Sequence, residues 1–173
     1  MTNKYVIFDR DGTLIKHTRY LTKISEIDYL PGVVEGLLKL KAAGYKFGIV
    51  TNQSLIGRKI AKKSVVDKIN SHIAEHLKKH GILLNFVYVC PHEPSQKCAC
   101  RKPKIELGLM AISNFGLNPN HSYMIGDTDS DIQFGINLGL KTVQVNPLGG
   151  IHSGADFVTT NMILAAEWIL KNE

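Results

Sequence analysis

The sequence predicts an α/β fold, a three-layer Rossmann-like sandwich around a central parallel sheet. Two observations predict it. Short apolar runs alternate with amphipathic stretches along the whole chain, and the apolar runs are continuous rather than alternating in polarity. Strands buried on both faces have this composition, and they form parallel sheets that helices cover on both sides. The length of 173 residues and the lack of a linker-like tract predict a single domain over residues 1–173.

The expected elements follow one another as strand and helix. The strands are expected at residues 4–8, 46–50, 86–90, 122–127 and 142–145, with a short sixth strand at 155–158. The helices are expected at residues 31–44, 64–79, 104–116 and 131–139, with a last helix from about residue 161. Ser64 is the expected N-cap of the second helix, because a serine hydroxyl accepts hydrogen bonds from first-turn N–H groups. A glycine-rich loop is expected at 147–154.

The composition is that of an ordinary globular protein, with 44% hydrophobic and 21% charged residues. It excludes a chain that is disordered throughout. No apolar run approaches the ~20 residues that cross a bilayer, and Asp9 interrupts the N-terminal apolar run too early for a signal peptide. We therefore expect a soluble cytoplasmic monomer with no membrane partner. The net charge of +6 suits an anionic ligand, or it is a solvated basic surface.

Polar clusters follow four of the expected strands. They are "DRDGT", "TNQS", the segment from "CPH" to "CRK", and "GDTDSD". Loops are polar in general, and this explains any one of the clusters. It does not explain why three of the four clusters contain closely spaced carboxylates or cations. In open α/β sheets, ligands bind at the carboxyl ends of the strands. We therefore expect the four clusters to meet at one site.

The carboxylates of these clusters predict a site for a hard cation. Asp9 and Asp11 lie two residues apart and repel each other unless a cation or a shared proton is present. Asp127, after a later strand, can supply a third oxygen ligand for Mg²⁺. An EF-hand is excluded, because "DTDSD" is followed by Ile132 where that loop needs Gly, and Leu138 stands where it needs Glu. The first strand also lacks the G-x-G-x-x-G of dinucleotide-binding folds.

Together, "FDRDGT", "VTNQ", "RKP" and "IGDTDSD" resemble, in sequence and in order, the four motifs of the haloacid-dehalogenase superfamily of phosphohydrolases. The resemblance spans residues 5 to about 145. It implies a Mg²⁺-dependent phosphatase that works through an aspartyl-phosphate. Only about forty residues separate the first two motifs, and about fifty separate the next two, so no large cap domain is expected.

The resemblance also implies a role for each motif residue. Asp9 would be the nucleophile, with Mg²⁺ reducing its repulsion from the phosphate. Asp11 would be the general acid and then the base, and would bind Mg²⁺ through its main-chain carbonyl. Asp127 would bind Mg²⁺ directly. Thr51 would hold a phosphoryl oxygen, and Lys102 would neutralise charge on the transferring group.

Asp131 has two interpretations of equal weight. It acts on the metal through a water molecule or a hydrogen bond, or it is simply the N-cap of the following helix. The segment 16–23, "KHTRYLTK", is expected to line the entrance of the site, although ordinary exposed loop residues would look the same. The residues expected to bind substrate are His17, Arg19, Tyr20, Asn52, Gln53, Ser54, Arg101 and Lys102.

All three cysteines lie in one short loop. Cys90, His92, Cys98 and Cys100 form the pattern C-P-H-x5-C-x-C, which offers three thiolates and one imidazole. This set predicts a closed, structural Zn²⁺ site. The alternatives are less well supported, because an odd number of cysteines does not make a disulfide framework and C-x-x-C is absent. Zinc would fix the loop that leads into "RKP".

A zinc loop before "CRKP" resembles two branches of the superfamily, the D-glycero-D-manno-heptose 1,7-bisphosphate phosphatases and the histidinol-phosphate phosphatases. "TNQSLIGR" resembles the heptose branch, whereas the five-residue spacer between His92 and Cys98 resembles the histidinol branch. Thr128 stands where the heptose branch often has a basic residue. Arg101 as a ligand for a second phosphate favours the heptose substrate. We expect that substrate, with histidinol phosphate as the alternative.

Two other functions are weighed against these. Polynucleotide 3′-phosphatases share "DxDGT" and "TNQ" but lack a zinc loop of this kind. The basic stretch 58–63, "RKIAKK", has no interleaved aromatic residues to stack on bases, so we expect no nucleic-acid partner. A non-catalytic, zinc-stabilised binding protein is the remaining alternative, although every expected catalytic residue is present.

Overall fold

The computed structural model describes residues 3–146 and 154–173 and confirms the predicted α/β sandwich. Its six strands are all parallel, in the order β3-β2-β1-β4-β5-β6. They are β1 (Tyr5–Phe8), β2 (Lys46–Asn52), β3 (Leu84–Cys90), β4 (Tyr123–Gly126), β5 (Lys141–Val145) and β6 (Phe157–Thr159). The expected loop at 147–154 lies outside the described residues, apart from its last position.

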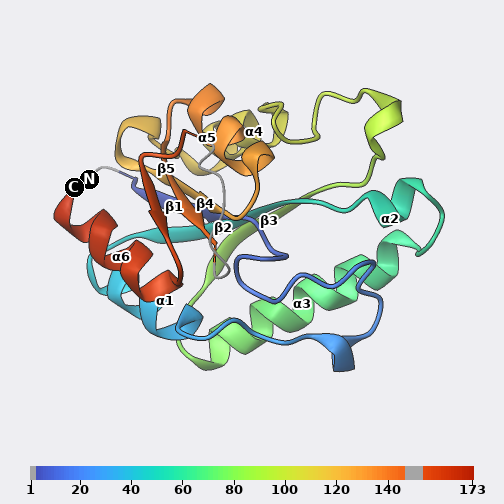
Figure 1. Cartoon of the computed structure of the whole chain (residues 1–173), viewed down its shortest axis with the longest axis horizontal. Coiled ribbons are helices and arrows are strands. Elements are labelled where there is room, and N and C mark those ends of the chain that lie inside the picture. Colours follow the sequence, from blue (N-terminus) through green and yellow to red (C-terminus); the bar gives the residue numbers. More distant parts are fainter. Residues whose placement is uncertain (1–2, 147–153) are drawn as a thin grey trace.

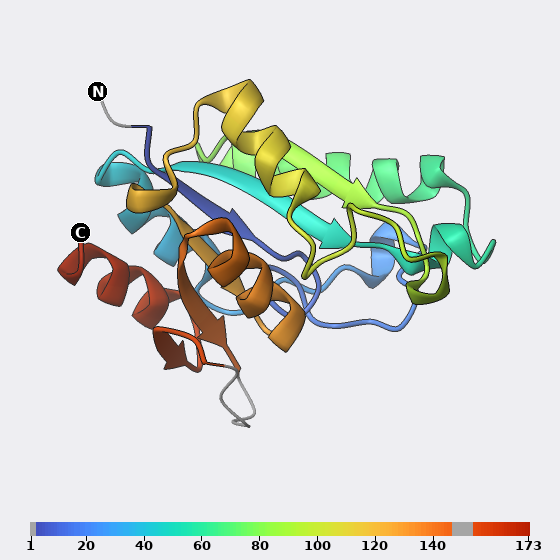
Figure 2. The same ribbon diagram turned by 90° about the horizontal axis from the view of Figure 1, so that it is seen from above.

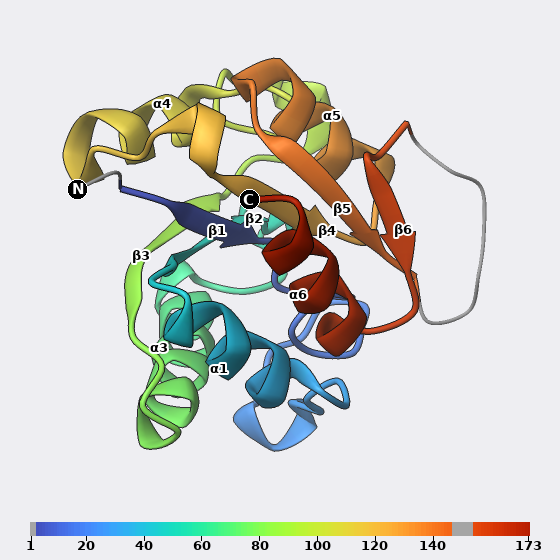
Figure 3. The ribbon, with the colours of Figure 1, turned by 90° about the vertical axis from the view of Figure 1, so that its left-hand side faces the viewer.

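Helices cover both faces of the sheet, as Figures 1 and 3 show. One face carries α1 (Val33–Ala42), α3 (Lys63–Lys79) and α6 (Met162–Lys171), and the other carries α4 (Glu106–Phe115) and α5 (Asp129–Leu138). A short helix, α2 (Ser54–Gly57), follows β2. Three single 3-10 turns complete the described elements, at Ile24–Glu26, Pro94–Gln96 and Pro119–His121.

The first strand shows why the apolar runs are continuous. Val6 and Phe8 belong to the core beneath α1, α3 and α6, whereas Tyr5 and Ile7 belong to the core beneath α4 and α5. Successive side chains of a strand point to opposite faces, so both faces of β1 need apolar residues. All four residues are buried.

The carboxyl ends of the central strands point to the same edge, where α2 and the loop after β3 also lie (Figure 2). The segments after β1, β2, β3 and β4 therefore meet there, as the polar clusters predict. No cap domain covers this edge in the part of the chain that the structure describes. Within the same residues, no helix is long and apolar enough to cross a membrane.

Two helix starts differ from the sequence prediction. Ser64 is not an N-cap, because α3 begins at Lys63 and Lys62 occupies the cap position without a side-chain hydrogen bond. Asp131 is not an N-cap either, because α5 begins at Asp129 and its N-cap is Thr128. The carboxylate of Asp131 instead accepts from the backbone N–H and the hydroxyl of Thr128, at 3.0 and 2.6 Å, which completes a capping box.

Candidate active site

Three carboxylates gather at the carboxyl ends of β1 and β4. Asp9 follows β1 directly, and its backbone N–H donates to the Ile125 carbonyl at 3.0 Å, which extends the pairing of the two strands. Asp127 follows β4, and Asp131 lies in the first turn of α5. One carboxylate oxygen of each lies within 4.8 Å of those of the other two. Parallel pairing of β1 with β4 thus brings together residues that are more than a hundred positions apart.

The ammonium group of Lys102 lies among these carboxylates. Its Nζ is 2.7 Å from Oδ1 of Asp9 and 2.6 Å from Oδ1 of Asp131, and it donates to the Val50 carbonyl at 2.6 Å. The residue is only 2% exposed. Burial alone lowers the pKa of Lys102, but the two carboxylates outweigh it and raise the pKa above its ordinary value. Lys102 therefore stays charged.

Burial also decides the charge state of the carboxylates. Burial, opposed by Lys102 and reinforced by Asp131, raises the pKa of Asp9 to about 6. Burial, followed by the charges of Asp9 and Asp131, raises the pKa of Asp127 to about 7. Three carboxylates face one ammonium group, so a formal charge of about −2 is left without a partner.

This acidic cluster fits a hard divalent cation. Oδ1 of Asp127 is buried and has no hydrogen-bond partner among the described residues, which is costly unless something else satisfies it. Gly12, at φ +85°, brings the turn so close that a Cβ would lie 2.1 Å from Oδ2 of Asp127. Both oxygens of Asp131 are already engaged, by Lys102 and Thr128. Asp9 and Asp127 are therefore the side chains best able to bind Mg²⁺.

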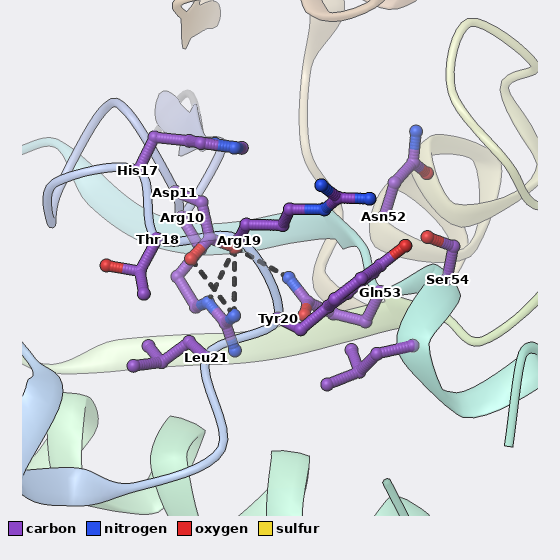
Figure 4. Close-up of a pocket in the computed structure, with 11 residues that line it drawn as sticks. Arg10, Asp11, His17, Thr18, Arg19, Tyr20, Leu21, Asn52, Gln53 and Ser54 are labelled. Carbon is purple, nitrogen blue, oxygen red and sulfur yellow. Dashed lines mark hydrogen bonds and ion pairs between the residues drawn. The ribbon is translucent and has the colours of Figure 1, made fainter. Parts of the chain in front are cut away.

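Asp11 points away from this cluster, toward a neighbouring pocket. Its carboxylate accepts from the amide of Gln53 at 2.7 Å and forms an ion pair with Arg10 at 2.8 Å. The pocket has a volume of ≈ 170 Å³, and Figure 4 shows the segment after β1 facing the end of β2 across it. Its lining contains six of the residues expected to bind substrate, namely His17, Arg19, Tyr20, Asn52, Gln53 and Ser54.

Two residues at the end of β2 hold other groups in place. Thr51 is buried, and its hydroxyl accepts from the amide of Gln53 at 2.9 Å. The amide of Asn52 accepts from the backbone N–H of Lys102 at 3.0 Å and donates to its carbonyl at 3.2 Å. The sequence suggested Asn52 as a substrate ligand. Its side chain lines the pocket, but its hydrogen bonds fix the backbone of Lys102.

The loop after β3 brings the three cysteines and His92 together. The thiol sulfurs lie 3.2–3.6 Å apart, and Nδ1 of His92 lies 3.3 Å from the Cys100 sulfur and 3.8 Å from the Cys90 sulfur. Two thiolates bound to one tetrahedral zinc at about 2.3 Å lie roughly 3.8 Å apart, so these groups need little movement to bind it. All four donors are occupied in such a site, which leaves no position for a substrate.

Arg101 belongs to this loop rather than to the pocket. Its Nη1 donates to the His92 carbonyl at 3.2 Å, and it is not among the residues that line the cavity. The loop also packs on α2, since the Gly57 N–H donates to the Pro91 carbonyl at 2.8 Å. The expected role of Arg101 as a ligand for a second phosphate finds no support in these contacts.

Comparisons with known proteins identify the family. The family model described as haloacid dehalogenase-like hydrolase matches residues 16–145, most of the chain. The chain belongs to the haloacid dehalogenase-like hydrolases. It is 35% identical over 156 residues to the D-glycero-beta-D-manno-heptose-1,7-bisphosphate 7-phosphatase of Helicobacter pylori, covering 88% of this chain and 90% of that relative. The resemblance inferred from the four motifs is confirmed, and the protein is a phosphatase of this family.

A second group of relatives carries names that refer to histidine biosynthesis. The phosphatase is 36% identical over 151 residues to the "Histidine biosynthesis bifunctional protein HisB" of Blochmanniella floridana, covering 86% of this chain but 42% of that relative. Among solved structures, a D,D-heptose 1,7-bisphosphate phosphatase from B. bronchiseptica, complexed with magnesium and phosphate, is similar with a TM-score of 0.86. The two chains are 24% identical, and the match covers 98% of this chain and 99% of the solved one. This similarity supports the α/β fold described above.

Sequence reasoning missed two partners of the phosphatase site. Arg10 lies between two residues of the first motif but received no role, and Asn70 lies in the middle of α3, far from any motif. Oδ1 of Asn70 accepts from Nη1 of Arg10 at 2.9 Å. A signal for Arg10 existed, because it continues the alternation of Val6 and Phe8 and so had to point into the core.

The raised pKa of Asp127 predicts how its removal affects stability. The pKa of Asp127 is about 7 in the folded chain and 3.8 ordinarily. Between these two pH values the folded chain therefore binds more protons than the unfolded chain does. The free energy of unfolding of magnesium-free protein should therefore fall as the pH rises from about 4 to about 7. Asp127→Asn should flatten this dependence and stabilise the protein at about pH 8 by roughly 1–2 kcal/mol.

Denaturant melts of protein dialysed free of magnesium, without a chelator that would strip the cysteine site, measure this effect. Asp129→Asn is the matched control, since Asp129 is exposed and lies outside the acidic cluster. An Asp127→Asn variant that is less stable than the parent at every pH would contradict the interpretation of the cluster.

The cysteine cluster predicts a zinc ion that stabilises its loop. We expect about one zinc per chain by metal analysis. Cys98→Ala should abolish zinc binding and lower the Tm by roughly 5–10 °C. Turnover should fall as well, because the loop leads directly to Lys102. Ser95→Ala, an exposed change in the same loop, should alter none of these. Full retention of stability and turnover after zinc loss would show that the cluster is not structural.

Proposed function

We propose that this phosphatase removes the 7-phosphate of D-glycero-D-manno-heptose 1,7-bisphosphate, a step of lipopolysaccharide-precursor synthesis, by way of an aspartyl-phosphate on Asp9. The observation that carries the proposal is the buried arrangement of Asp9, Lys102 and Asp127, with one oxygen of Asp127 left unsatisfied. The similarity to heptose-bisphosphate phosphatases over nearly their whole length supports the choice of substrate.

Asp9 is suited to attack phosphorus. Lys102 binds its Oδ1, which leaves Oδ2 as the attacking oxygen. With a pKa of about 6, the carboxylate is ionised at neutral pH. Mg²⁺ bound by Asp9, Asp127 and the main-chain carbonyl of Asp11 would supply positive charge against the phosphate. The ammonium of Lys102 balances the remaining charge of the transferring group.

Asp11 handles the protons of both half-reactions. As the Asp9 oxygen bonds to phosphorus, the bond to the substrate oxygen breaks, and the Asp11 carboxyl gives its proton to that oxygen. A water molecule then attacks the aspartyl-phosphate, and Asp11 takes one of its protons. Inorganic phosphate leaves, and Asp9 is restored. The Thr51 hydroxyl, whose oxygen already accepts from Gln53, is free to donate its proton to a phosphoryl oxygen.

The pocket beside Asp11 is where the rest of the substrate would bind. Arg19 gives it positive charge, and the Arg19 guanidinium lies 5.4 Å over the ring of Tyr20. A sugar with a second phosphate suits this lining, since guanidinium groups bind phosphate through paired hydrogen bonds. Arg19 takes the place of Arg101 in this proposal, because Arg101 is held by the zinc loop.

Histidinol phosphate remains the second candidate substrate. Two of the relatives that match at 36% identity are bifunctional histidine-biosynthesis proteins, although the chain spans only about two fifths of their length. The carboxylates of Asp9 and Asp11 and the ammonium group of Lys102 would have the same roles in its hydrolysis. The two substrates differ in what the pocket binds, a second phosphate or an ammonium and imidazole.

Phosphate release from the two compounds in the presence of Mg²⁺ tests the proposal. We expect a kcat/KM for the heptose bisphosphate at least roughly tenfold above that for histidinol phosphate. Arg19→Ala should reduce this preference, and Asp9→Asn should lower turnover of both by about a thousandfold or more. A preference for histidinol phosphate would reject the substrate, and an active Asp9→Asn variant would reject the mechanism.

A further inference from the structure

Arg10 is a charged residue in an apolar position. Its contact with Asn70 of α3 places it on the same side of the sheet as Val6 and Phe8, the side that α1, α3 and α6 cover. It is 1% exposed and is the largest fully buried side chain of the described residues. Burying a guanidinium costs several kcal/mol unless its partners are well placed, and an apolar side chain would fill the same space without that cost. Fold stability alone therefore does not explain an arginine here.

The guanidinium joins helix α3 to Asp11. Its Nη1 donates to Oδ1 of Asn70 at 2.9 Å, and Asn70 is itself buried in α3. Its Nε donates to Oδ2 of Asp11 at 3.0 Å, and its Nη2 lies 2.8 Å from Oδ2 and 3.1 Å from Oδ1. Asn70 thus binds one edge of the guanidinium. The other edge holds the carboxylate of Asp11, as Figure 4 shows.

The two oxygens of Asp11 are held unequally. Oδ2 accepts from Arg10 and also from the Gln53 amide at 2.7 Å, whereas Oδ1 has one contact, from Arg10 at 3.1 Å, among the residues that the structure describes. Oδ1 therefore keeps the capacity to exchange a proton. An exposed carboxylate without these partners would rotate freely and would seldom present one oxygen to the substrate.

We propose that Arg10, anchored by Asn70, is a positioning residue that holds Oδ2 of Asp11 so that Oδ1 faces the leaving group. The inference rests on the proposed role of Asp11 as general acid and base. Arg10 does not touch substrate in this proposal. It sets the geometry in which the Asp11 proton reaches the departing alkoxide and in which Asp11 later accepts a proton from water.

A leaving-group comparison tests the proposal. A primary alkyl phosphate needs a proton on its departing oxygen, whereas p-nitrophenyl phosphate releases a stable phenolate that needs almost none. The alkyl substrate is whichever of heptose bisphosphate and histidinol phosphate the unmodified protein hydrolyses. Arg10→Lys keeps the charge but loses the planar fork. We expect its kcat/KM to fall roughly ten- to a hundredfold for the alkyl phosphate and less than about threefold for p-nitrophenyl phosphate.

Three further variants separate positioning from damage to the fold. Asn70→Ala keeps Arg10 but removes its anchor. It should give the same split, that is, a larger loss of kcat/KM on the alkyl phosphate than on p-nitrophenyl phosphate, although both losses should be smaller. This variant remains informative if Arg10→Lys does not fold. Ile73→Val, a buried change on the same helix, should leave the ratio of the two kcat/KM values unchanged. Asp11→Asn should show the full split, since it removes the proton itself.

The outcomes distinguish this inference from the proposed function. A split for Asp11→Asn and for both Arg10→Lys and Asn70→Ala supports the positioning role. A split for Asp11→Asn with equal losses on both substrates for Arg10→Lys and Asn70→Ala overturns the role of Arg10 and leaves the mechanism intact. No split for Asp11→Asn overturns the proposed role of Asp11 and the inference with it.

Discussion

One buried ammonium group, that of Lys102, links two strands and a helix at the carboxyl edge of the sheet. It reaches the carboxylate that follows β1, the Val50 carbonyl of β2 and the Asp131 carboxylate of α5, all within 2.7 Å. Without it, Asp9 and Asp131 would be buried charges facing each other, which costs several kcal/mol. The same contact fixes which oxygen of Asp9 is free. The interaction that joins these elements of the fold therefore also orients the carboxylate that we propose as the nucleophile.

The position of Lys102 depends in turn on two supports. Asn52 holds its backbone through both ends of one amide, and the cysteine loop fixes the chain immediately before it. That loop is tied to the end of β2 by a hydrogen bond from the Gln53 N–H to the Cys90 carbonyl at 2.8 Å. A zinc ion held by the cysteines, outside the acidic cluster, would thus matter for turnover, because it would limit the motion of the loop that leads to Lys102.

Much of the fold and of the acidic cluster could be predicted because both follow from local pattern and strand order. Continuous apolar runs predict a parallel sheet, and polar residues after strands then have to meet at one edge. Other features depend on tertiary partners. Thr128 rather than Asp131 is the N-cap of α5, and the Asp131 carboxylate accepts instead from Thr128 and from the ammonium group of Lys102, which lies outside the helix. Asn52 and Arg101 are polar in sequence, but only the folded chain shows that Asn52 binds the backbone of Lys102 and that Arg101 donates to the His92 carbonyl.

The most direct test of the account is to locate the phosphate on enzyme quenched with acid during turnover. Mass spectrometry of the digested protein should find a phosphate adduct on the peptide that contains Asp9, stable in acid and lost in mild base, as an acyl phosphate is. Lys102→Met should reduce the amount of this adduct formed in the first turnover, because it removes the group that orients the Asp9 carboxylate. Phosphate found on another residue, or a full first-turnover yield of adduct without Lys102, would contradict the central claim.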